Sequence, residues 1–176
     1  MRIISGDLKG RVLPKNAKLK ARPTTDKAKE ALFNILNFSI DFEEVKVLDL
    51  FSGTGNISFE FASRGVKDIT SVEVRFDHVK HIQKVNELLG TDVKIIKADV
   101  FKFVKKTSET YDFVFADPPF DMKDFPDVLT AIFEAEIINE GGTLVVEHGP
   151  RHEFSKLENF SETRNYGKVN FSFFKF

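Results

Sequence analysis

Strand-like and helix-like patterns alternate from residue 45 to the end of the chain, and this alternation constrains the fold most. Short apolar runs typical of buried strands are followed by segments whose apolar residues recur at helical spacing. This order predicts an α/β fold with a mostly parallel seven-stranded sheet and helices on both faces. Strands are expected over 45–51, 69–74, 93–98, 113–116, 143–147, 161–166 and 169–176, and helices over 26–37, 57–64, 76–89, 100–105 and 125–134.

The composition excludes several kinds of protein. At 176 residues the chain is long enough for one domain with a substantial core. It has no run of 18 apolar residues and no signal-peptide core at its start, so we expect a cytoplasmic protein without a membrane partner. The absence of cysteine excludes disulfides, thiolate metal sites and cysteine nucleophiles. His78 and His81 fall on an expected helix, where solvated side chains are a better interpretation than metal ligands.

Positive charge is concentrated at the start of the chain. Residues 1–30 contain nine Lys or Arg and three Asp or Glu, whereas the whole chain has a net charge of −1. A basic segment attached to an acidic body is typical of proteins that hold a polyanion at one edge. The same segment carries apolar pairs between turn-forming Gly and Pro residues, which predicts a packed β-hairpin rather than a loose tail. We therefore divide the chain into a basic arm, residues 1–22, and a main domain, residues 23–176.

A strand followed by a glycine turn and a helix, residues 47–56, marks the expected ligand site. In sheets of this kind, ligands bind at the carboxyl ends of the strands. Gly53 and Gly55 permit positive φ angles and close approach by a ligand. Glu73 ends the next strand 18 residues after Gly55, where a carboxylate can accept both hydroxyls of a ribose. Asp99 follows the third strand, where an adenine ring would lie. Each of the two acids could instead only cap a helix.

The choice between a dinucleotide and S-adenosylmethionine depends on Asp49 and Ser58. Ser58 stands where a dinucleotide fingerprint has a third Gly or Ala, which weighs mildly against that ligand. Asp49 would repel a pyrophosphate but could bind the ammonium group of a methionine moiety. The sequence therefore predicts S-adenosylmethionine as the cofactor, and an NAD-dependent oxidoreductase is the weaker alternative. The expected cofactor-binding residues are Asp49, Phe51, Ser52, Gly53, Thr54, Gly55, Asn56, Glu73, Val74, Asp99 and Val100.

The tetrapeptide Asp117-Pro118-Pro119-Phe120 follows an apolar strand and indicates chemistry on a nitrogen. Two consecutive prolines remove two backbone donors, so carbonyl groups and the carboxylate of Asp117 form an acceptor-rich surface. Such a surface suits a planar amine, whose two hydrogens need two acceptors, and Phe120 offers a ring on which a nucleobase can stack. An ordinary turn at the end of a strand is the alternative. We assign Asp117, Pro118, Pro119 and Phe120 as the catalytic residues.

Several motifs together resemble the bacterial 16S ribosomal RNA guanine-N2 methyltransferases, a family often called RsmD, over nearly the full length of the chain. They are Arg2-Ile3-Ile4-Ser5-Gly6, Lys9-Gly10-Arg11, Arg22-Pro23-Thr24-Thr25-Asp26, residues 30–36 and 48–55, Ser63-Arg64-Gly65 and the tetrapeptide at 117–120. The resemblance implies a Rossmann-like class I methyltransferase fold, methyl transfer to guanine N2, and 16S rRNA in an assembling small subunit as the partner; we expect a monomer. The expected RNA-binding residues are Arg2, Lys9, Arg11, Arg22, Thr24, Lys27 and Lys29.

The chain departs from the family pattern in two places. Family members usually have Arg where this chain has Lys27 and Lys29, and Ala-rich sequence where it has Asn56, Ile57 and Ser58. Lysine keeps the charge but loses the bidentate contacts of arginine with phosphate. The residues alone leave two alternative functions open: methylation of adenine N6 in DNA or RNA, which needs the same acceptors, and an inactive nucleic-acid-binding module.

Overall fold

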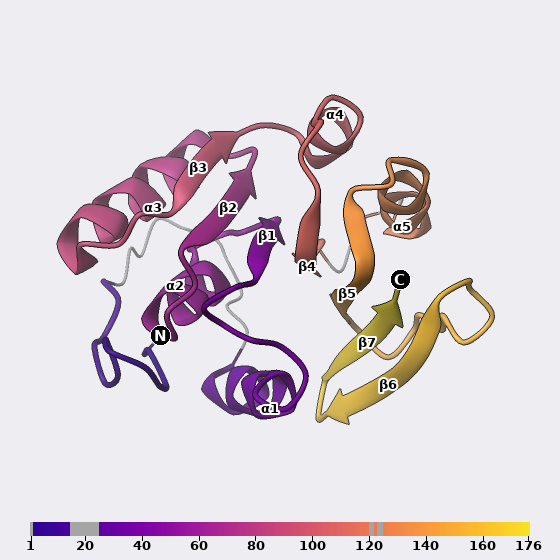
Figure 1. Cartoon of the computed structure of the whole chain (residues 1–176), viewed down its shortest axis with the longest axis horizontal. Coiled ribbons are helices and arrows are strands. Elements are labelled where there is room, and N and C mark those ends of the chain that lie inside the picture. The colour runs from indigo at the N-terminus through magenta and orange to yellow at the C-terminus, as the bar shows by residue number, and fades with distance from the viewer. Residues whose placement is uncertain (1, 15–24, 120–121, 123–124) are drawn as a thin grey trace.

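The structure, a computed structural model, describes residues 2–14, 25–119, 122 and 125–176. Helices and strands alternate along most of this chain (Figure 1). Within the described residues, no helix is long and apolar enough to cross a membrane. The helices are α1 (Asp26–Leu36), α2 (Asn56–Ser63), α3 (Phe76–Leu89), α4 (Val100–Val104) and α5 (Phe125–Glu134). The strands are β1 (Lys46–Leu50), β2 (Asp68–Glu73), β3 (Lys94–Lys97), β4 (Tyr111–Ala116), β5 (Ile138–His148), β6 (Phe160–Tyr166) and β7 (Val169–Lys175).

All seven strands join one sheet in the order β3-β2-β1-β4-β5-β7-β6. The pairs among β1 to β5 are parallel, and β7 runs antiparallel between β5 and β6. The chain moves outward from β1 to β3 and then returns to the other side of β1 to form β4. This reversal creates a switch point between β1 and β4, where ligands bind in such sheets. The predicted α/β class and mostly parallel seven-stranded sheet are confirmed.

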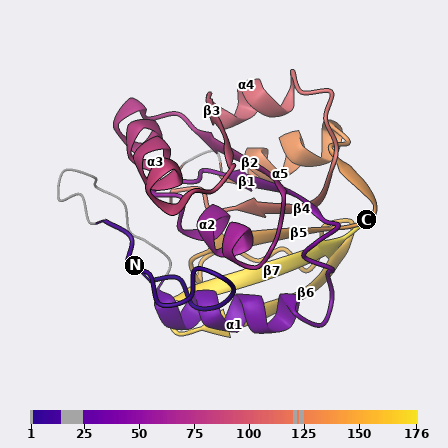
Figure 2. The same cartoon turned by 60° about the vertical axis from the view of Figure 1, so that its left-hand side comes forward.

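Helices cover both faces of the sheet, as predicted (Figures 1 and 2). Side chains of α1, α2 and α3 pack with the N-terminal segment on one face, which we call the α1 face, and those of α4 and α5 pack on the other. Strand residues alternate between the two cores: Phe113 and Phe115 belong to the first, and Val114 and Ala116 to the second. This alternation determines the direction in which a side chain at the end of each strand points.

The N-terminal segment, residues 2–14, is packed against α2 and α1. Its two ends meet in an antiparallel bridge, and Ile3 and Leu13 are each 1% exposed. At Gly6 an added Cβ would lie 1.7 Å from the backbone oxygen of Ser63, so the segment approaches α2 closely at this glycine. A packed segment closed by one bridge therefore stands where the sequence predicted a packed hairpin.

The largest difference from the predicted elements is the start of β5. The sequence predicted a strand over 143–147, but β5 begins at Ile138. The consecutive glycines Gly141 and Gly142 are typical of a turn. They instead belong to an irregular first part of the strand, opposite a register shift in β4. The other element boundaries differ from the prediction by at most two residues.

The two histidines of α3 were expected to be solvated, and that expectation is wrong. His78 is 4% exposed and His81 is 7% exposed. Each lies four residues before an apolar residue of the buried stripe, Ile82 or Val85, so helical spacing turns both imidazoles inward. Among the residues that the structure describes, their Nε2 atoms have no hydrogen-bond partner.

Candidate active site

Three carboxyl groups gather at the carboxyl ends of neighbouring strands. Asp49 lies in β1 between Ser71 of β2 and Phe115 of β4. Glu73 ends β2, and Asp117 follows the last residue of β4. Alternation along the strands puts these three acids on the same face as Phe115, the α1 face. The structure therefore brings together three of the acids that the sequence placed at strand ends.

The turn between β1 and α2 has an unusual backbone and little free space. Phe51 has a φ of 61°, which is uncommon for a residue other than glycine and often marks a functional segment. Gly55, the N-cap of α2, has a φ of 77°, and a Cβ at this position would lie 2.6 Å from the ring of Phe59. Only glycine meets both requirements. The amide of Ser52 donates to the carbonyl of Val72 at 3.0 Å, which ties the turn to β2.

Asp49 is a buried acid with Ser58 as its partner. The side chain is 2% exposed, and burial raises its pKa from 3.8 to about 7. The amide and the hydroxyl of Ser58 both donate to its Oδ2 atom, which opposes the rise in pKa. Ser58 Oγ also lies 2.8 Å from Ser71 Oγ in β2. Ser58, which departs from the dinucleotide fingerprint, is therefore the hydrogen-bond partner of Asp49, the acid that disfavours a dinucleotide.

Glu73 is bonded to the backbone of the glycine turn. Its Oε2 atom accepts from the amide of Gly53 at 2.9 Å, and its Oε1 atom accepts from the amide of Arg75 at 2.8 Å. Nδ1 of His78 lies 3.4 Å from the same Oε2 atom. These bonds fix the turn relative to β2. The predicted contact of Glu73 with a ribose stays a prediction.

Asp99 caps α4, as the alternative interpretation of this residue required. Its Oδ1 atom accepts from the amide of Lys102 at 3.1 Å. Two apolar residues flank the acids at this edge: Val74 after β2 is 55% exposed, and Val100 at the start of α4 is 5% exposed. An exposed valine next to Glu73 provides an apolar surface suited to one face of a planar ring.

The tetrapeptide predicted to be catalytic begins where β4 leaves the sheet. The amide of Asp117 donates to the carbonyl of Leu50 at 3.4 Å, so this residue lies directly beside the start of the glycine turn. Asp117 is half-buried, Pro118 is buried and Pro119 is exposed. The carbonyl of Pro119 accepts from the amide of Met122 at 2.9 Å. Phe120 lies outside the described residues, so its stacking role stays a prediction.

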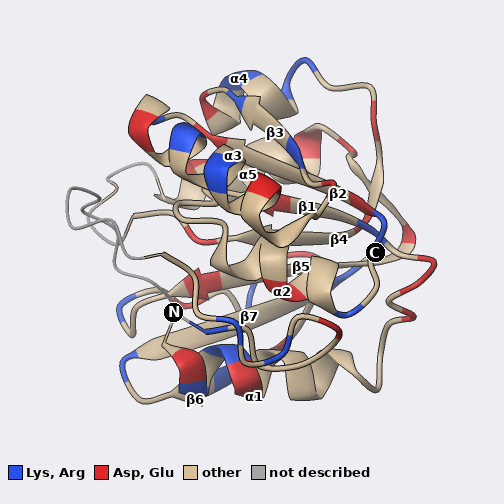
Figure 3. Cartoon of the chain, turned by 90° about the vertical axis from the view of Figure 1, so that its left-hand side faces the viewer, with Lys and Arg blue, Asp and Glu red and all other residues tan. Residues whose placement is uncertain are grey.

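The residues predicted to bind RNA divide into three groups: exposed residues, residues outside the described part of the chain, and the buried Lys29. Four of them are exposed: Arg2, Lys9, Arg11 and Lys27. Figure 3 shows the blue Lys and Arg positions of the N-terminal segment beside α1 and α2. Arg22 and Thr24 lie outside the described residues.

Lys29 is not a surface residue, and its assignment as an RNA contact is wrong. Its side chain is 0% exposed. The Nζ atom lies 3.0 Å from Glu60 Oε2, 2.8 Å from the carbonyl of Arg2 and 2.9 Å from Asn56 Oδ1. Burial lowers the pKa of Lys29, and the charge of Glu60 opposes that change. Lys29 and Asn56, which both depart from the family pattern, are therefore in contact with each other.

Sequence reasoning missed two buried acids, Glu60 and Glu147. Glu60 is 0% exposed and also accepts from the amides of Ile4 at 2.8 Å and Ser5 at 3.1 Å. Glu60 could have been identified from the sequence, because it is a single acid inside the otherwise apolar centre of a helix. Glu147 is 3% exposed near the end of β5. An acid at the end of a buried strand was the signal that pointed to Asp117, and it could have identified Glu147.

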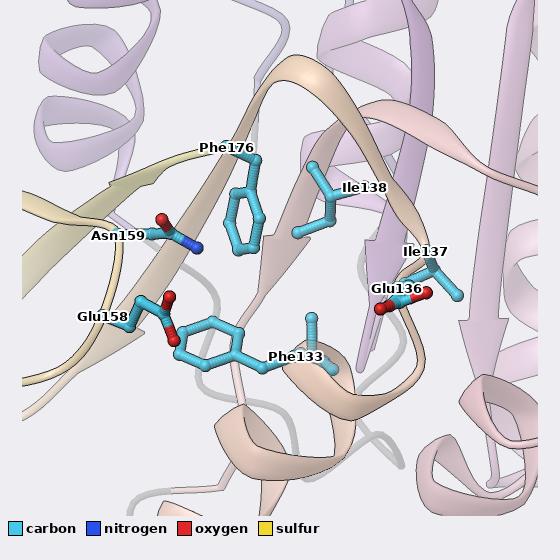
Figure 4. A pocket seen from close by; sticks show the side chains of 8 residues that line it. Phe133, Glu136, Ile137, Ile138, Glu158, Asn159 and Phe176 are labelled. Carbon is cyan, nitrogen blue, oxygen red and sulfur yellow. The ribbon is translucent and has the colours of Figure 1, made fainter.

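A pocket of about 370 Å³ lies at the opposite edge of the sheet (Figure 4). Its walls come from the end of α5, the start of β5 and the residue after β7, with Phe133, Ile138 and Phe176 among them. The parallel strands begin at this edge, so the length of the strands separates the pocket from Asp117. The pocket is not part of the candidate site.

Comparisons with known proteins show which proteins this chain is similar to. A family model described as "Conserved hypothetical protein 95" matches residues 1–175. A Bacillus subtilis protein described as a candidate rRNA methyltransferase is 35% identical over 156 residues, covering 84% of this chain and 82% of that protein. Ribosomal RNA small subunit methyltransferase D of Haemophilus influenzae is 31% identical, covering 84% and 78%. The Thermus thermophilus 16S rRNA N2 G1207 methyltransferase, solved with AdoMet and guanosine, has a TM-score of 0.71 and 21% identity, covering 89% of this chain and 44% of that one.

Proposed function

This chain belongs to the family described as Conserved hypothetical protein 95, and we propose that it transfers a methyl group from S-adenosylmethionine to the exocyclic N2 of a guanine in small-subunit ribosomal RNA. The proposal is carried by the hydrogen bond between the amide of Asp117 and the carbonyl of Leu50. This bond places the acceptor-rich tetrapeptide beside the glycine turn. Further support comes from the Haemophilus influenzae relative, named for the small subunit, and from the guanosine bound to the Thermus thermophilus enzyme.

The residues at this edge fit S-adenosylmethionine. At Gly53, which has a φ of 56°, an added Cβ would lie 3.8 Å from the carbonyl oxygen of Phe51, so the turn leaves space for a ligand close to the backbone. Glu73 offers a carboxylate for ribose hydroxyls, and Val74 and Asp99 offer an apolar surface and an acceptor for adenine. When bound, the cofactor supplies a methyl group attached to a positively charged sulfur. The acidic edge, including the buried Asp49, favours the positive charges of such a ligand.

Asp117 and Pro118 prepare the amine of the target base. The exocyclic amine of guanine is a poor nucleophile because its lone pair is delocalised into the ring. The carboxylate of Asp117 accepts one amine hydrogen and the carbonyl of Pro118 accepts the other, which moves the nitrogen toward tetrahedral geometry and localises the lone pair. The proton released as the nitrogen–carbon bond forms passes to the Asp117 carboxylate. Such positioning can provide effective molarities of about 10⁵ M or more.

The exposed basic residues of the N-terminal segment hold the RNA. Arg2, Lys9 and Arg11, together with Lys27 at the start of α1, offer cationic side chains to phosphate groups. The substrate in this proposal is 16S rRNA within an assembling small subunit, and the protein acts as a monomer.

Methylation of small subunits from a strain that lacks the gene tests the proposed reaction. The protein and labelled cofactor are incubated with these subunits and, separately, with free 16S rRNA; the label is then mapped and the nucleosides are identified by mass spectrometry. We expect N2-methylguanosine at one position in the particles. N6-methyladenosine would support the adenine alternative, and labelling of free RNA but never of particles would contradict the assembly-stage substrate.

Replacement of Asp117 tests the assigned role of the tetrapeptide. Asp117→Ala removes one acceptor for the amine and leaves the glycine turn intact. We expect kcat to fall by about 10²–10³-fold, the usual effect of removing one group that stabilises a transition state. Cofactor affinity, measured by calorimetry, should change by less than about two-fold, since Asp117 contacts the base. Full methyl transfer by this variant would refute the assignment.

A further inference from the structure

Guanine and adenine differ next to the amine that each of them carries. In guanine the N2 amine lies beside the N1–H donor, whereas in adenine the N6 amine lies beside an N1 acceptor. Enzymes that act on extruded bases read this Watson–Crick edge through hydrogen bonds. Asp117 and the carbonyl of Pro118 accept from an amine, so they fit both bases. A site that selects guanine needs a further acceptor beside them.

Glu147 occupies a position next to Asp117 in the sheet. β4 and β5 pair in parallel, and their last paired residues are Ala116 and Val146. Asp117 and Glu147 are the residues that follow this pair on the two strands. Adjacent strands lie about 4.8 Å apart. The two carboxyl groups therefore start from neighbouring backbone positions at the edge where the amine is bound.

Both side chains face the same side of the sheet. Ala116 and Val146 belong to the core on the α4 and α5 side. Successive strand residues point to opposite faces, so Asp117 and Glu147 point to the α1 face. The pairing of Glu147 with Phe171 of β7 agrees with this, because Phe171 belongs to the core of the α1 face.

Glu147 is a buried acid that the proposed mechanism does not yet use. It is 3% exposed, and both it and Asp117 have interactions within the chain. A carboxylate can accept at about four lone-pair sites, so these interactions leave capacity for another donor. Two acids side by side at strand ends repel each other. The adjacent N1–H and N2–H donors of one guanine offset that repulsion.

We propose that the carboxylate of Glu147 accepts the N1–H of the target guanine while Asp117 accepts from its N2 amine. This inference rests on the proposed function of the site and assigns Glu147 as the residue that distinguishes guanine from adenine. Adenine would direct its N1 lone pair at the carboxylate, so two acceptors would face each other. A polar site strongly rejects a base that would leave the buried polar groups of the site unpaired. An apolar site discriminates much less between bases that differ only in size.

A base analogue at the methylated position tests the contact directly. 2,6-Diaminopurine keeps the 2-amine but has an acceptor at N1. Two RNAs are compared, one with guanine and one with 2,6-diaminopurine at the position mapped with labelled cofactor. For the wild-type protein, we expect kcat/KM for the analogue to be at least about 100-fold lower. Equal kcat/KM for the two RNAs would overturn the inference, whether or not any variant folds.

Glu147→Gln tests whether this residue is the source of the discrimination. Its amide can donate to N1 of the analogue, so we expect the preference for guanine to fall below about 10-fold. Glu140→Gln, at an exposed position of the same strand, is the matched control and should keep the wild-type preference. Thermal unfolding and cofactor affinity are measured for both variants.

The outcomes separate this inference from the proposed function. If Glu147→Gln lowers kcat/KM equally for both RNAs, Glu147 has only a structural role and the inference is wrong. If the wild-type protein makes no N2-methylguanosine in unmodified RNA, the proposed function itself fails. A preference for guanine that falls only in Glu147→Gln, with Glu140→Gln unchanged, supports the inference.

Discussion

Burial gives Lys27 and Lys29 different roles within the first turn of α1. Lys29 is buried against Glu60, whereas Lys27 is exposed. Lys29→Met is expected to lower the free energy of unfolding by about 3 kcal/mol, because Glu60 loses a buried partner. Lys27→Met should change it by less than about 0.5 kcal/mol and weaken RNA binding instead. Urea denaturation and RNA titration measure the two effects, and equal losses of stability in the two variants would contradict this division.

The raised pKa of Asp49 makes its contribution to stability depend on pH. Its pKa is about 7 in the folded protein and 3.8 in the unfolded chain, so the folded state binds more protons between these values. The stabilising contribution is therefore complete below about pH 4 and is lost as pH rises through about 7. We expect Asp49→Asn to gain stability relative to the wild type as pH increases from 5 to 8. The difference in Tm between the wild type and Asp49→Asn, measured at several pH values, tests this expectation, because the effects of the other titrating groups cancel in the difference. A difference in Tm that does not change with pH would argue against a raised pKa of Asp49.

At the scale of elements, the turn between β1 and α2 depends on one glycine more than on the others. Gly55→Ala combines a left-handed backbone with a contact against Phe59, so we expect a loss of about 2–4 kcal/mol in the free energy of unfolding and weaker cofactor binding. Gly90, which ends α3, has a similar φ of 66°, but no atom of the described part of the chain lies within 4 Å of an added Cβ. Gly90→Ala should therefore cost only about 1 kcal/mol and leave cofactor affinity unchanged. Denaturation and calorimetry compare the two, and equal effects would show that the contact with Phe59 is unimportant.

Elements could be predicted where a local pattern and burial agree. The bounds of α3 and α5 match the expected ranges because their apolar stripes begin and end with the helices. Burial of Lys29 was readable as well, because Leu32 and Phe33 follow it at helical spacing. Its contact with Glu60 in α2 was not, since contacts between helices depend on how the whole sheet is assembled. The start of β5 was missed because adjacent glycines are common in both turns and irregular strands.

The candidate site was predictable as a set of strand ends but not as a set of contacts. Asp49, Glu73 and Asp117 meet because parallel strands end at the same edge. Their partners depend on tertiary placement: Ser58 reaches Asp49 from α2, and the amide of Gly53, in the turn after β1, reaches Glu73 at the end of the neighbouring strand β2. No spacing in the sequence shows these bonds.

For the whole molecule, the basic N-terminal segment should determine how RNA binding responds to salt. Replacing Arg2, Lys9 or Arg11 with Gln removes one exposed cation beside α2 in each case. Each change should reduce the slope of log K against log salt by about 0.7–0.9 and leave cofactor affinity unchanged. Lys106→Gln, an exposed lysine after α4, serves as the control. Filter-binding titrations at several salt concentrations measure the slope, and equal slopes for all variants would place the RNA elsewhere.

The four acids near the carboxyl ends of β1, β2, β4 and β5 also have a consequence for the nucleotide as a whole. Together they give one edge of the sheet a negative potential, while the exposed cations belong to a segment fixed on α2. A phosphate group is repelled from that edge and attracted to the segment, whereas an uncharged base is not repelled. We therefore expect the protein to separate the two parts of one nucleotide by charge, with the sugar–phosphate chain outside and only the heterocycle beside the acids.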